Sequence, residues 1–246
     1  MIPTSPSMTI FCWKVMIEMG AVFGHIDENL RIIREKVSEA ADKYRSPDDK
    51  IRIMAVTKTV PPEAVNHAIG LGIDLLGENR VQEYQSKKDA YDKSAEVHFI
   101  GHLQTNKIKY IISSVSMIQS IDSLKLAQET DRLAAKNGLV MDILCEVNIG
   151  GEESKSGVAP EELGDLLREI ASLESLRLRG LMTIPPPSDS DIFLGRMQEL
   201  YNKYASEYGF DTLSMGMTHD YAQAIRYGSN IVRIGTGLFG ARDYSK

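Results

Sequence analysis

The 246-residue chain lacks the features that mark several large classes of protein. It has only two cysteines, Cys12 and Cys145, so we expect no disulfide framework and no metal site, and a reducing compartment such as the cytoplasm. No run of about 18 apolar residues occurs, so no membrane-spanning helix is predicted. The net charge of −6 argues against a general grip on nucleic acid, although backbone amides can still bind a local anion.

The N-terminal segment has no charge over residues 1–13 and lacks the basic stretch with which a signal peptide begins. We therefore expect residues 1–22 to be a poorly ordered extension, and residues 23–246 to form one domain. Residues 25–44 predict an extra N-terminal helix, because apolar side chains recur there three or four positions apart.

Short apolar runs then alternate with helical patterns along the rest of the chain. The expected strands are residues 51–56, 74–76, 97–100, 117–119, 141–147, 177–182, 212–214 and 231–234. The expected helices between them are residues 62–69, 80–93, 104–112, 123–136, 160–173, 192–208 and 219–227. Eight such repeats in a chain of this length predict an α/β fold, a single (β/α)8 TIM barrel. A doubly wound open sheet is the alternative, and the lack of Gly-x-Gly-x-x-Gly after the first strand disfavours its dinucleotide-binding form.

Lys58 stands where the first strand ends, just before Pro61 and Pro62 open a helix. Chemistry in such barrels collects at the C-terminal ends of the strands, and an amine placed there can form a Schiff base with a carbonyl. A solvated lysine and a lysine that binds phosphate are the plainer interpretations.

Two glycine-containing loops, residues 214–218 and 235–237, follow the last two expected strands. Small residues let backbone N–H groups approach an anion, and barrels often bind phosphate at this place. Ordinary turn chemistry explains one such loop, but two in these places favour phosphate. Arg233 ends the eighth strand and could contact a phosphate, a carboxylate or a ring nitrogen, or form a plain salt bridge. Asn79 could orient a ring substituent or cap the helix that follows it.

Two histidines precede and follow the end of the third strand. His98 alternates with Phe99 inside the strand, which favours a hydrogen-bonded core residue. His102 lies on the expected rim and could transfer protons, but no carboxylate partner is near it in the sequence.

Seven motifs, in this order, closely resemble the pyridoxal 5′-phosphate (PLP) homeostasis proteins, which are single-domain relatives of the alanine racemase N-terminal barrel. They are VTKT (56–59), GENRVQE (77–83), HFIGHLQTNK (98–107), ESKSG (153–157), GLMTIP (180–185), LSMGM (213–217) and VRIGTGLFG (232–240). The chain departs from the family pattern at Arg80, where a tyrosine is usual, and at residues 218–220, where Ser-Asp-Asp is common.

The resemblance implies a cofactor, PLP, and six residues that bind it. They are Lys58, Asn79, Ser214, Arg233, Gly235 and Thr236. Lys58 would carry the aldimine, Arg233 would face the pyridine nitrogen, and Asn79 would contact the ring region. The other three would hold the phosphate.

We expect a non-catalytic protein of vitamin B6 homeostasis, with no catalytic residues, that holds PLP as a lysine aldimine. An arginine beside the pyridine nitrogen disfavours its protonation and weakens the ring as an electron sink. In the resembling racemase the second acid–base group comes from another domain of the partner subunit, and the sequence offers no counterpart. The alternatives are a PLP-dependent amino-acid racemase-like enzyme and a sugar-phosphate barrel enzyme. Expected partners are PLP and PLP-dependent acceptor enzymes, with no nucleic acid and no membrane, and we expect a monomer rather than a weak dimer.

Overall fold

The computed structural model describes the backbone of residues 6–152 and 154–241, with side chains from residue 22 onward. Eight parallel strands close into a barrel in chain order, because β8 pairs with β1 as well as with β7. The strands are β1 (Arg52–Val56), β2 (Leu75–Glu78), β3 (Glu96–Phe99), β4 (Met117–Ile121), β5 (Met141–Glu146), β6 (Leu176–Met182), β7 (Thr212–Ser214) and β8 (Ile231–Ile234). The predicted (β/α)8 barrel is confirmed, and each predicted strand matches within two residues at each end.

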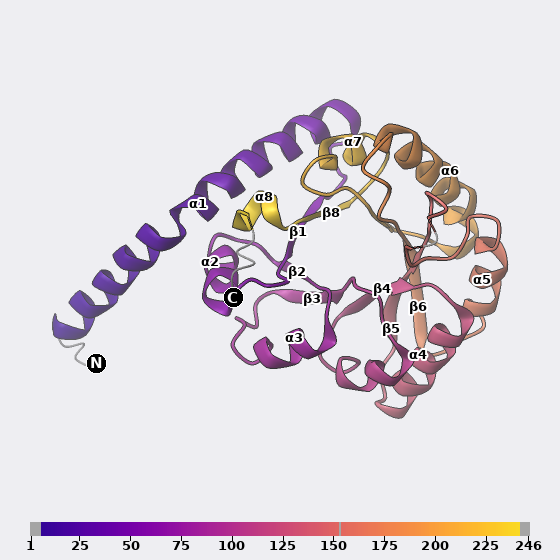
Figure 1. Ribbon diagram of the computed structural model, residues 1–246, viewed down its shortest axis with the longest axis horizontal. Helices are drawn as coiled ribbons and strands as arrows, with labels where there is room; N and C mark the ends of the chain where they lie inside the picture. The colour runs from indigo at the N-terminus through magenta and orange to yellow at the C-terminus, as the bar shows by residue number, and fades with distance from the viewer. Residues whose placement is uncertain (1–5, 153, 242–246) are drawn as a thin grey trace.

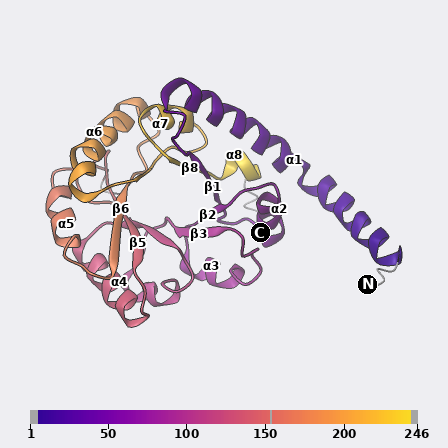
Figure 2. The ribbon, with the colours of Figure 1, turned by 180° about the vertical axis from the view of Figure 1, so that it is seen from behind.

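Helices surround the strands on the outside, as both ribbon views show (Figure 1, Figure 2). They are α1 (Pro6–Tyr44), α2 (Pro62–Gly70), α3 (Val81–Lys87), α4 (Leu124–Lys136), α5 (Leu163–Ile170), α6 (Ser190–Tyr208), α7 (Tyr221–Arg226) and α8 (Thr236–Phe239), with a 3₁₀ helix, η1 (Thr105–Tyr110). Among the helices of the described chain, none combines the length and the apolar character that a bilayer crossing requires.

Two helices differ from the prediction for local physical reasons. The expected α-helix over residues 104–112 is largely a 3₁₀ turn, in which side chains three apart share a face, and Ile108 and Ile111 are both fully buried. The expected helix over residues 80–93 ends at Lys87, because Tyr91 turns inward and donates a hydrogen bond to Glu78 at 2.6 Å.

The extra N-terminal helix is confirmed, but α1 begins at Pro6 rather than near His25. It projects past the barrel in both views, and its later turns pack against α7 and α8 (Figure 1, Figure 2). Apolar side chains on this later part, including Ile26 and Leu30, are buried. The described helix therefore takes in most of the segment expected to be an extension, and the domain division at residue 22 stays a prediction.

The strands divide their side chains between the helices and the interior of the barrel. Ala55 and Leu76 join the large apolar cluster under the helices, whereas Met54 and Leu75, one position away, belong to a small separate cluster. Because side chains alternate along a strand, these two face inward, into the lumen. The lumen also holds buried polar side chains, among them His98, Gln119 and Arg233, and the candidate site lies at the C-terminal ends of the strands.

Candidate functional site

The predicted lysine lies at the C-terminal end of β1, in a turn whose flanking residues form hydrogen bonds to Glu78 and Glu83. Lys58 is half-buried, and it follows Thr57, whose hydroxyl donates to the buried Glu78 carboxylate at 2.7 Å. Thr59 comes next with φ of 63°, a left-handed conformation that a β-branched residue adopts only under constraint. The backbone on both sides of Lys58 is therefore fixed at the C-terminal end of β1.

Helix α3 supplies that constraint. The Glu83 carboxylate accepts a hydrogen bond from the Thr59 amide and forms an ion pair with Lys87. The Lys87 ammonium also donates to the Thr57 carbonyl at 3.4 Å. Burial favours the neutral acid, but the hydrogen bonds from Lys87 and the Thr59 amide hold the pKa of Glu83 below its usual value. Glu83 thus acts as an ionised anchor for the turn that carries Lys58.

The loops after β7 and β8 meet at the rim and form a small cradle. The Gly237 amide donates to the Thr218 hydroxyl at 3.2 Å, and the hydroxyls of Thr218 and Thr236 lie 3.5 Å apart. A β-carbon at Gly237 would lie 2.8 Å from the Thr218 methyl group, so this close approach requires glycine. One at Gly235 would lie 3.5 Å from Val56, which brings the cradle beside the strand that leads to Lys58.

Thr218 belongs to the predicted phosphate loop over residues 214–218 but was not among the six residues selected from the resemblance. The residue predicted from the loop after β7 was Ser214, but its hydroxyl is fully buried in the lumen and is bonded there to Gln119 and Arg233. The signal in the sequence for Thr218 was its place at the end of the 214–218 loop, although residues 218–220 also depart from the family pattern. Gly235 and Thr236 do lie at the rim, as predicted.

Arg233 lies inside the barrel with its guanidinium fixed at two points. It is 3% exposed, and it donates to the Ser214 hydroxyl at 2.8 Å and to the Thr183 carbonyl at 2.7 Å. Burial lowers the pKa of Arg233 to about 10, while the negative charges of Glu146 and Asp220 act in the opposite direction. Arg233 therefore remains a cation at neutral pH, held in a fixed orientation in the lumen.

Asn79 follows β2 and does not cap the next helix through its side chain. The N-cap of α3 is Arg80, and no side-chain cap hydrogen bond is made there. The Asn79 side-chain oxygen is buried and has no hydrogen-bond partner among the described residues. Because a buried acceptor without a partner is costly, this geometry suits a residue whose partner is a ligand.

Glu146, at the end of β5, is a second buried group that the sequence prediction did not select. It is 6% exposed, and one carboxylate oxygen lacks a hydrogen-bond partner within the described part of the chain. Burial, together with the negative charge of Asp122, raises the pKa of Glu146 to about 7, and the positive charge of Arg233 opposes this rise. A glutamate inside an apolar strand run was the available signal, because such residues are rarely buried without a role.

The two histidines have different surroundings. His98 is 3% exposed and hydrogen-bonded to Gln119, which confirms the prediction of a core residue. His102 is on the rim, and its Nδ1 lies 3.7 Å from the Asp122 carboxylate and 3.1 Å from the Ser156 hydroxyl. The carboxylate partner that the local sequence did not reveal is thus supplied by the end of β4.

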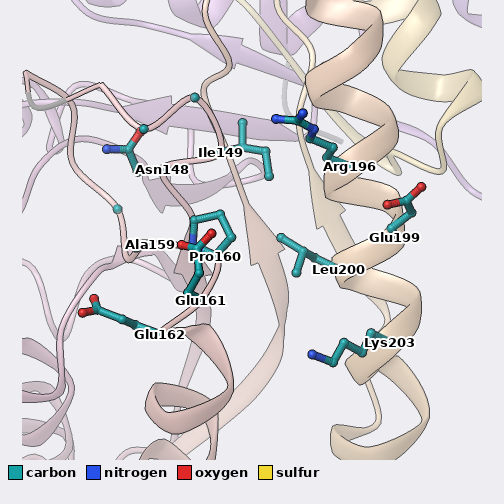
Figure 3. A pocket seen from close by; sticks show the side chains of 13 residues that line it. Asn148, Ile149, Ala159, Pro160, Glu161, Glu162, Arg196, Glu199, Leu200 and Lys203 are labelled. Carbon is teal, nitrogen blue, oxygen red and sulfur yellow. The ribbon is translucent and has the colours of Figure 1, made fainter.

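The described chain also has a groove that lies apart from this site. An open groove of about 860 Å³ runs between α6 and the loop after β5, where Arg196 and Lys203 extend toward Ile149 and Pro160 (Figure 3). None of the six predicted site residues lines it.

Within the described chain, no group of three His, Cys, Asp or Glu side chains is arranged to hold a metal ion. Cys145 is buried, and burial raises the pKa of its thiol to about 12.

Comparison with known proteins agrees with this geometry. The family model for the N-terminal domain of alanine racemase matches residues 24–243. Together with the closed barrel and the lysine after β1, this match defines the class, an alanine-racemase-type barrel domain.

Two curated relatives narrow the class. One from Aquifex aeolicus, named pyridoxal phosphate homeostasis protein, is 42% identical over 224 residues, which cover 88% of this chain and 98% of the relative. One of the same name from Escherichia coli K12 is 38% identical over 233 residues, covering 90% and 98%. The chain belongs to the family of pyridoxal phosphate homeostasis proteins.

Solved structures share the barrel. A protein of unknown function from Bifidobacterium adolescentis has a TM-score of 0.81 at 31% identity, covering 89% of this chain and 96% of that one. PipY from Synechococcus elongatus, solved with PLP bound, has a TM-score of 0.74 at 27% identity, covering 87% and 100%. Alanine racemase from Clostridium difficile has a TM-score of 0.69 at 18% identity and shares the fold, with 57% of its chain covered.

Proposed function

We propose that this chain binds PLP as an aldimine of Lys58 and holds it without turnover, for intracellular homeostasis of the cofactor. The proposal rests on one observation, that three features occur together at the C-terminal end of the barrel. A half-buried amine follows β1, a cradle of hydroxyls and amides joins the neighbouring β8 and β7 loops, and a buried cation projects from β8. When bound, PLP supplies a reactive aldehyde, for which an amine at a strand end is the matching nucleophile.

The residues at the mouth fit a phosphorylated pyridine aldehyde. The hydroxyls of Thr218 and Thr236 offer donors to a phosphate. The Gly237 amide donates to Thr218 and so holds that hydroxyl in place, and a side chain at Gly237 would collide with Thr218. Gly235 belongs to the same loop. The orphaned oxygen of Asn79 suits a ring substituent that donates a hydrogen bond. Arg233 would face the ring nitrogen, and Ser214 would act through Arg233 rather than by touching the phosphate.

Arg233 also supports a carrier over an enzyme. A buried guanidinium only donates hydrogen bonds, so it favours an unprotonated ring nitrogen and lowers the ability of the ring to stabilise a carbanion. The names of the relatives from Aquifex aeolicus and Escherichia coli, and the PLP-bound PipY structure, support the same assignment. We propose further that the chain acts in the cytoplasm as a monomer and passes PLP to PLP-dependent acceptor enzymes.

Spectral titration of the purified protein with PLP tests this function. The expected result is stoichiometric growth of an absorbance band that differs from free PLP, with no racemisation, decarboxylation or transamination of D- and L-amino acids above the rate with free PLP. Absence of a spectral change up to millimolar PLP would contradict binding, and turnover above the free-cofactor rate would contradict the carrier role.

A second candidate function, a racemase-like enzyme, is favoured by two observations. Glu146 has a pKa near neutrality in the lumen, and Asp122 pairs with His102 on the rim, so proton-transfer groups are present beside the cofactor site. Exchange of the α-hydrogen of alanine and serine with solvent deuterium is the sensitive test. Exchange that requires Lys58 and is lost in Glu146→Gln or His102→Ala would replace the carrier with an enzyme.

A further inference from the structure

A continuous hydrogen-bonded network of buried side chains runs through the barrel, from the N-terminal part of the lumen to the candidate site. The Gln119 amide nitrogen lies 2.8 Å from His98 Nδ1, and its amide oxygen accepts from the Ser214 hydroxyl at 2.7 Å. The Ser214 oxygen in turn accepts from Arg233 Nη1 at 2.8 Å. Each of these four side chains is at most 3% exposed.

Arg233 determines which group donates in each hydrogen bond of this network. A guanidinium only donates, so the Ser214 oxygen is an acceptor on that side and its hydrogen points to the Gln119 oxygen. The Gln119 nitrogen then faces His98, and it only donates, so His98 Nδ1 carries a lone pair. The His98 proton is therefore on Nε2, which faces the Glu96 carboxylate at 3.6 Å.

Burial of His98 is consistent with this neutral form. Desolvation lowers the pKa of His98, and it outweighs the opposing effect of the hydrogen bond that the ring donates to Glu96. The charged groups that face the ring are Arg52 on β1, Glu96 on β3 and Asp142 on β5. A cavity of about 680 Å³ at this end of the barrel is also lined by charged residues of the neighbouring segments, namely Lys50, Asp74, Arg179 and Asp211.

We propose that Gln119 is a positioning residue for the cofactor site. By accepting the hydrogen of the Ser214 hydroxyl, Gln119 turns a lone pair of the Ser214 oxygen toward Arg233. The guanidinium is thereby held beside the place where the ring nitrogen of bound PLP would lie. His98 fixes which end of the Gln119 amide faces Ser214. This inference rests on the proposed function, because it assigns Arg233 to the ring nitrogen of PLP.

The test compares two ligands on one variant. Gln119→Met keeps the length of the side chain and removes both hydrogen bonds, so the Ser214 hydroxyl is free to turn and donate elsewhere. We expect equilibrium titration to give about tenfold weaker binding of PLP. For the analogue in which CH replaces the ring nitrogen, we expect less than a twofold change. Gln223→Met, an exposed position on α7, is the matched control and leaves both affinities unchanged.

A conservative variant separates positioning from simple packing. In Gln119→Glu the new carboxylate still accepts from Ser214, and it pairs with His98 only when Nδ1 is protonated. We expect affinity for PLP within about threefold of the wild type, and an upward shift of the His98 titration measured by NMR. Rescue by Gln119→Glu alongside loss in Gln119→Met supports positioning, and both variants are checked by thermal unfolding.

The outcomes distinguish this inference from the proposed function. If wild-type protein does not bind PLP, the proposed function fails and the inference fails with it. If the wild type binds but Gln119→Met binds PLP equally well, only the inference is overturned. Equal weakening of PLP and of its CH analogue also overturns it, because Gln119 would then support the fold rather than Arg233.

Discussion

The two ends of the barrel differ in how far their polar groups are paired within the protein. At the N-terminal end, Arg52 pairs with Asp74 at 3.3 Å and with Glu96 at 3.1 Å, and Arg179 pairs with Asp142 and Asp211. At the C-terminal mouth, the buried oxygens of Asn79 and Glu146 find no hydrogen-bond partner among the described residues. At the first end even the Asp142 oxygen that lacks a hydrogen bond lies 3.3 Å from the Arg177 guanidinium in an ion pair, whereas at the mouth no ion pair with Glu146 is found within the described chain.

Backbone conformation follows the same division. The turn that carries Lys58 includes Thr59 in a left-handed conformation, held by Glu83 from α3. Strain of this kind persists only where the surroundings enforce it, and it is commonest at functional sites. The comparison therefore indicates that the N-terminal end serves stability and that the mouth serves binding, as the general plan of such barrels leads one to expect.

The largest expected effect is the loss of covalently fixable cofactor at the mouth. Lys58→Ala removes the only amine proposed to react with PLP, so borohydride should fix no pyridoxyl group at this site. Lys50→Ala, at the N-terminal end, is the matched control and should label like the wild type. A single defined labelled peptide in Lys58→Ala would show that another lysine reacts.

The next effect concerns the pH dependence of stability. Because the pKa of Glu146 is raised to about 7, the folded protein keeps a proton that the unfolded chain has lost above about pH 4.5. This stabilisation is fully present below the unfolded pKa and is lost as pH rises through the folded pKa. We expect Glu146→Gln to remove a decline of roughly 3 kcal/mol in the free energy of unfolding between pH 4.5 and 8.

Denaturant unfolding at several pH values measures this decline in the wild type and in Glu146→Gln. Glu199→Gln, an exposed residue of α6, is the control and should keep the wild-type slope. Identical slopes in the wild type and Glu146→Gln would mean that Glu146 titrates like an ordinary glutamate, and the distinction between the two ends would lose one of its supports.

A smaller effect is expected from the hydroxyls of the cradle. Thr218→Ala and Thr236→Ala each remove one hydrogen bond to a charged phosphate, worth about 1.5 kcal/mol or tenfold in affinity. Equilibrium titration with PLP and with pyridoxal, which lacks the phosphate, provides the measurement. The losses should appear for PLP and vanish for pyridoxal, and Thr212→Ala, at the other end of β7, should change neither. Unaltered PLP affinity in the double variant would move the phosphate site elsewhere.

The smallest effect belongs to the N-terminal end. Arg179→Ala breaks partly exposed ion pairs with Asp142 and Asp211, each worth up to about 1 kcal/mol. We expect the melting temperature to fall by about 2–4 °C per kcal/mol lost, with affinity for PLP unchanged. A marked loss of affinity would show that the two ends are coupled more strongly than their separate chemistry suggests.

The sequence predicted the barrel well because its signals are local. Each strand is a short apolar run, and the order of strands and helices follows from their alternation. Lys58, Asn79, Arg233 and the glycine loop after β8 became candidates because they follow or end such runs, and the family resemblance then supplied their expected roles. Local patterns could not show that the Ser214 hydroxyl lies in the lumen, bonded to Gln119, or that the Thr218 hydroxyl lies beside Gly237.

The groups that the sequence analysis missed depend on contacts between residues far apart in the chain. Asp122 reaches His102 from the next strand, and Gln119 lies between His98 and Ser214, 21 and 95 positions away in the chain. The raised pKa of Glu146 likewise requires the neighbouring charge of Asp122 and burial by the surrounding strands. No periodicity or spacing encodes these contacts, because they depend on the register between neighbouring strands and, for Gln119 and Ser214, on the meeting of β4 and β7 across the lumen.

Peptide mapping of wild-type protein, reduced with borohydride in the presence of one equivalent of PLP, tests the central claim most directly. The account predicts a single pyridoxyl-labelled peptide, with the label on Lys58 at the C-terminal mouth. Label on Lys50, on Lys155 or spread over several surface lysines would contradict it.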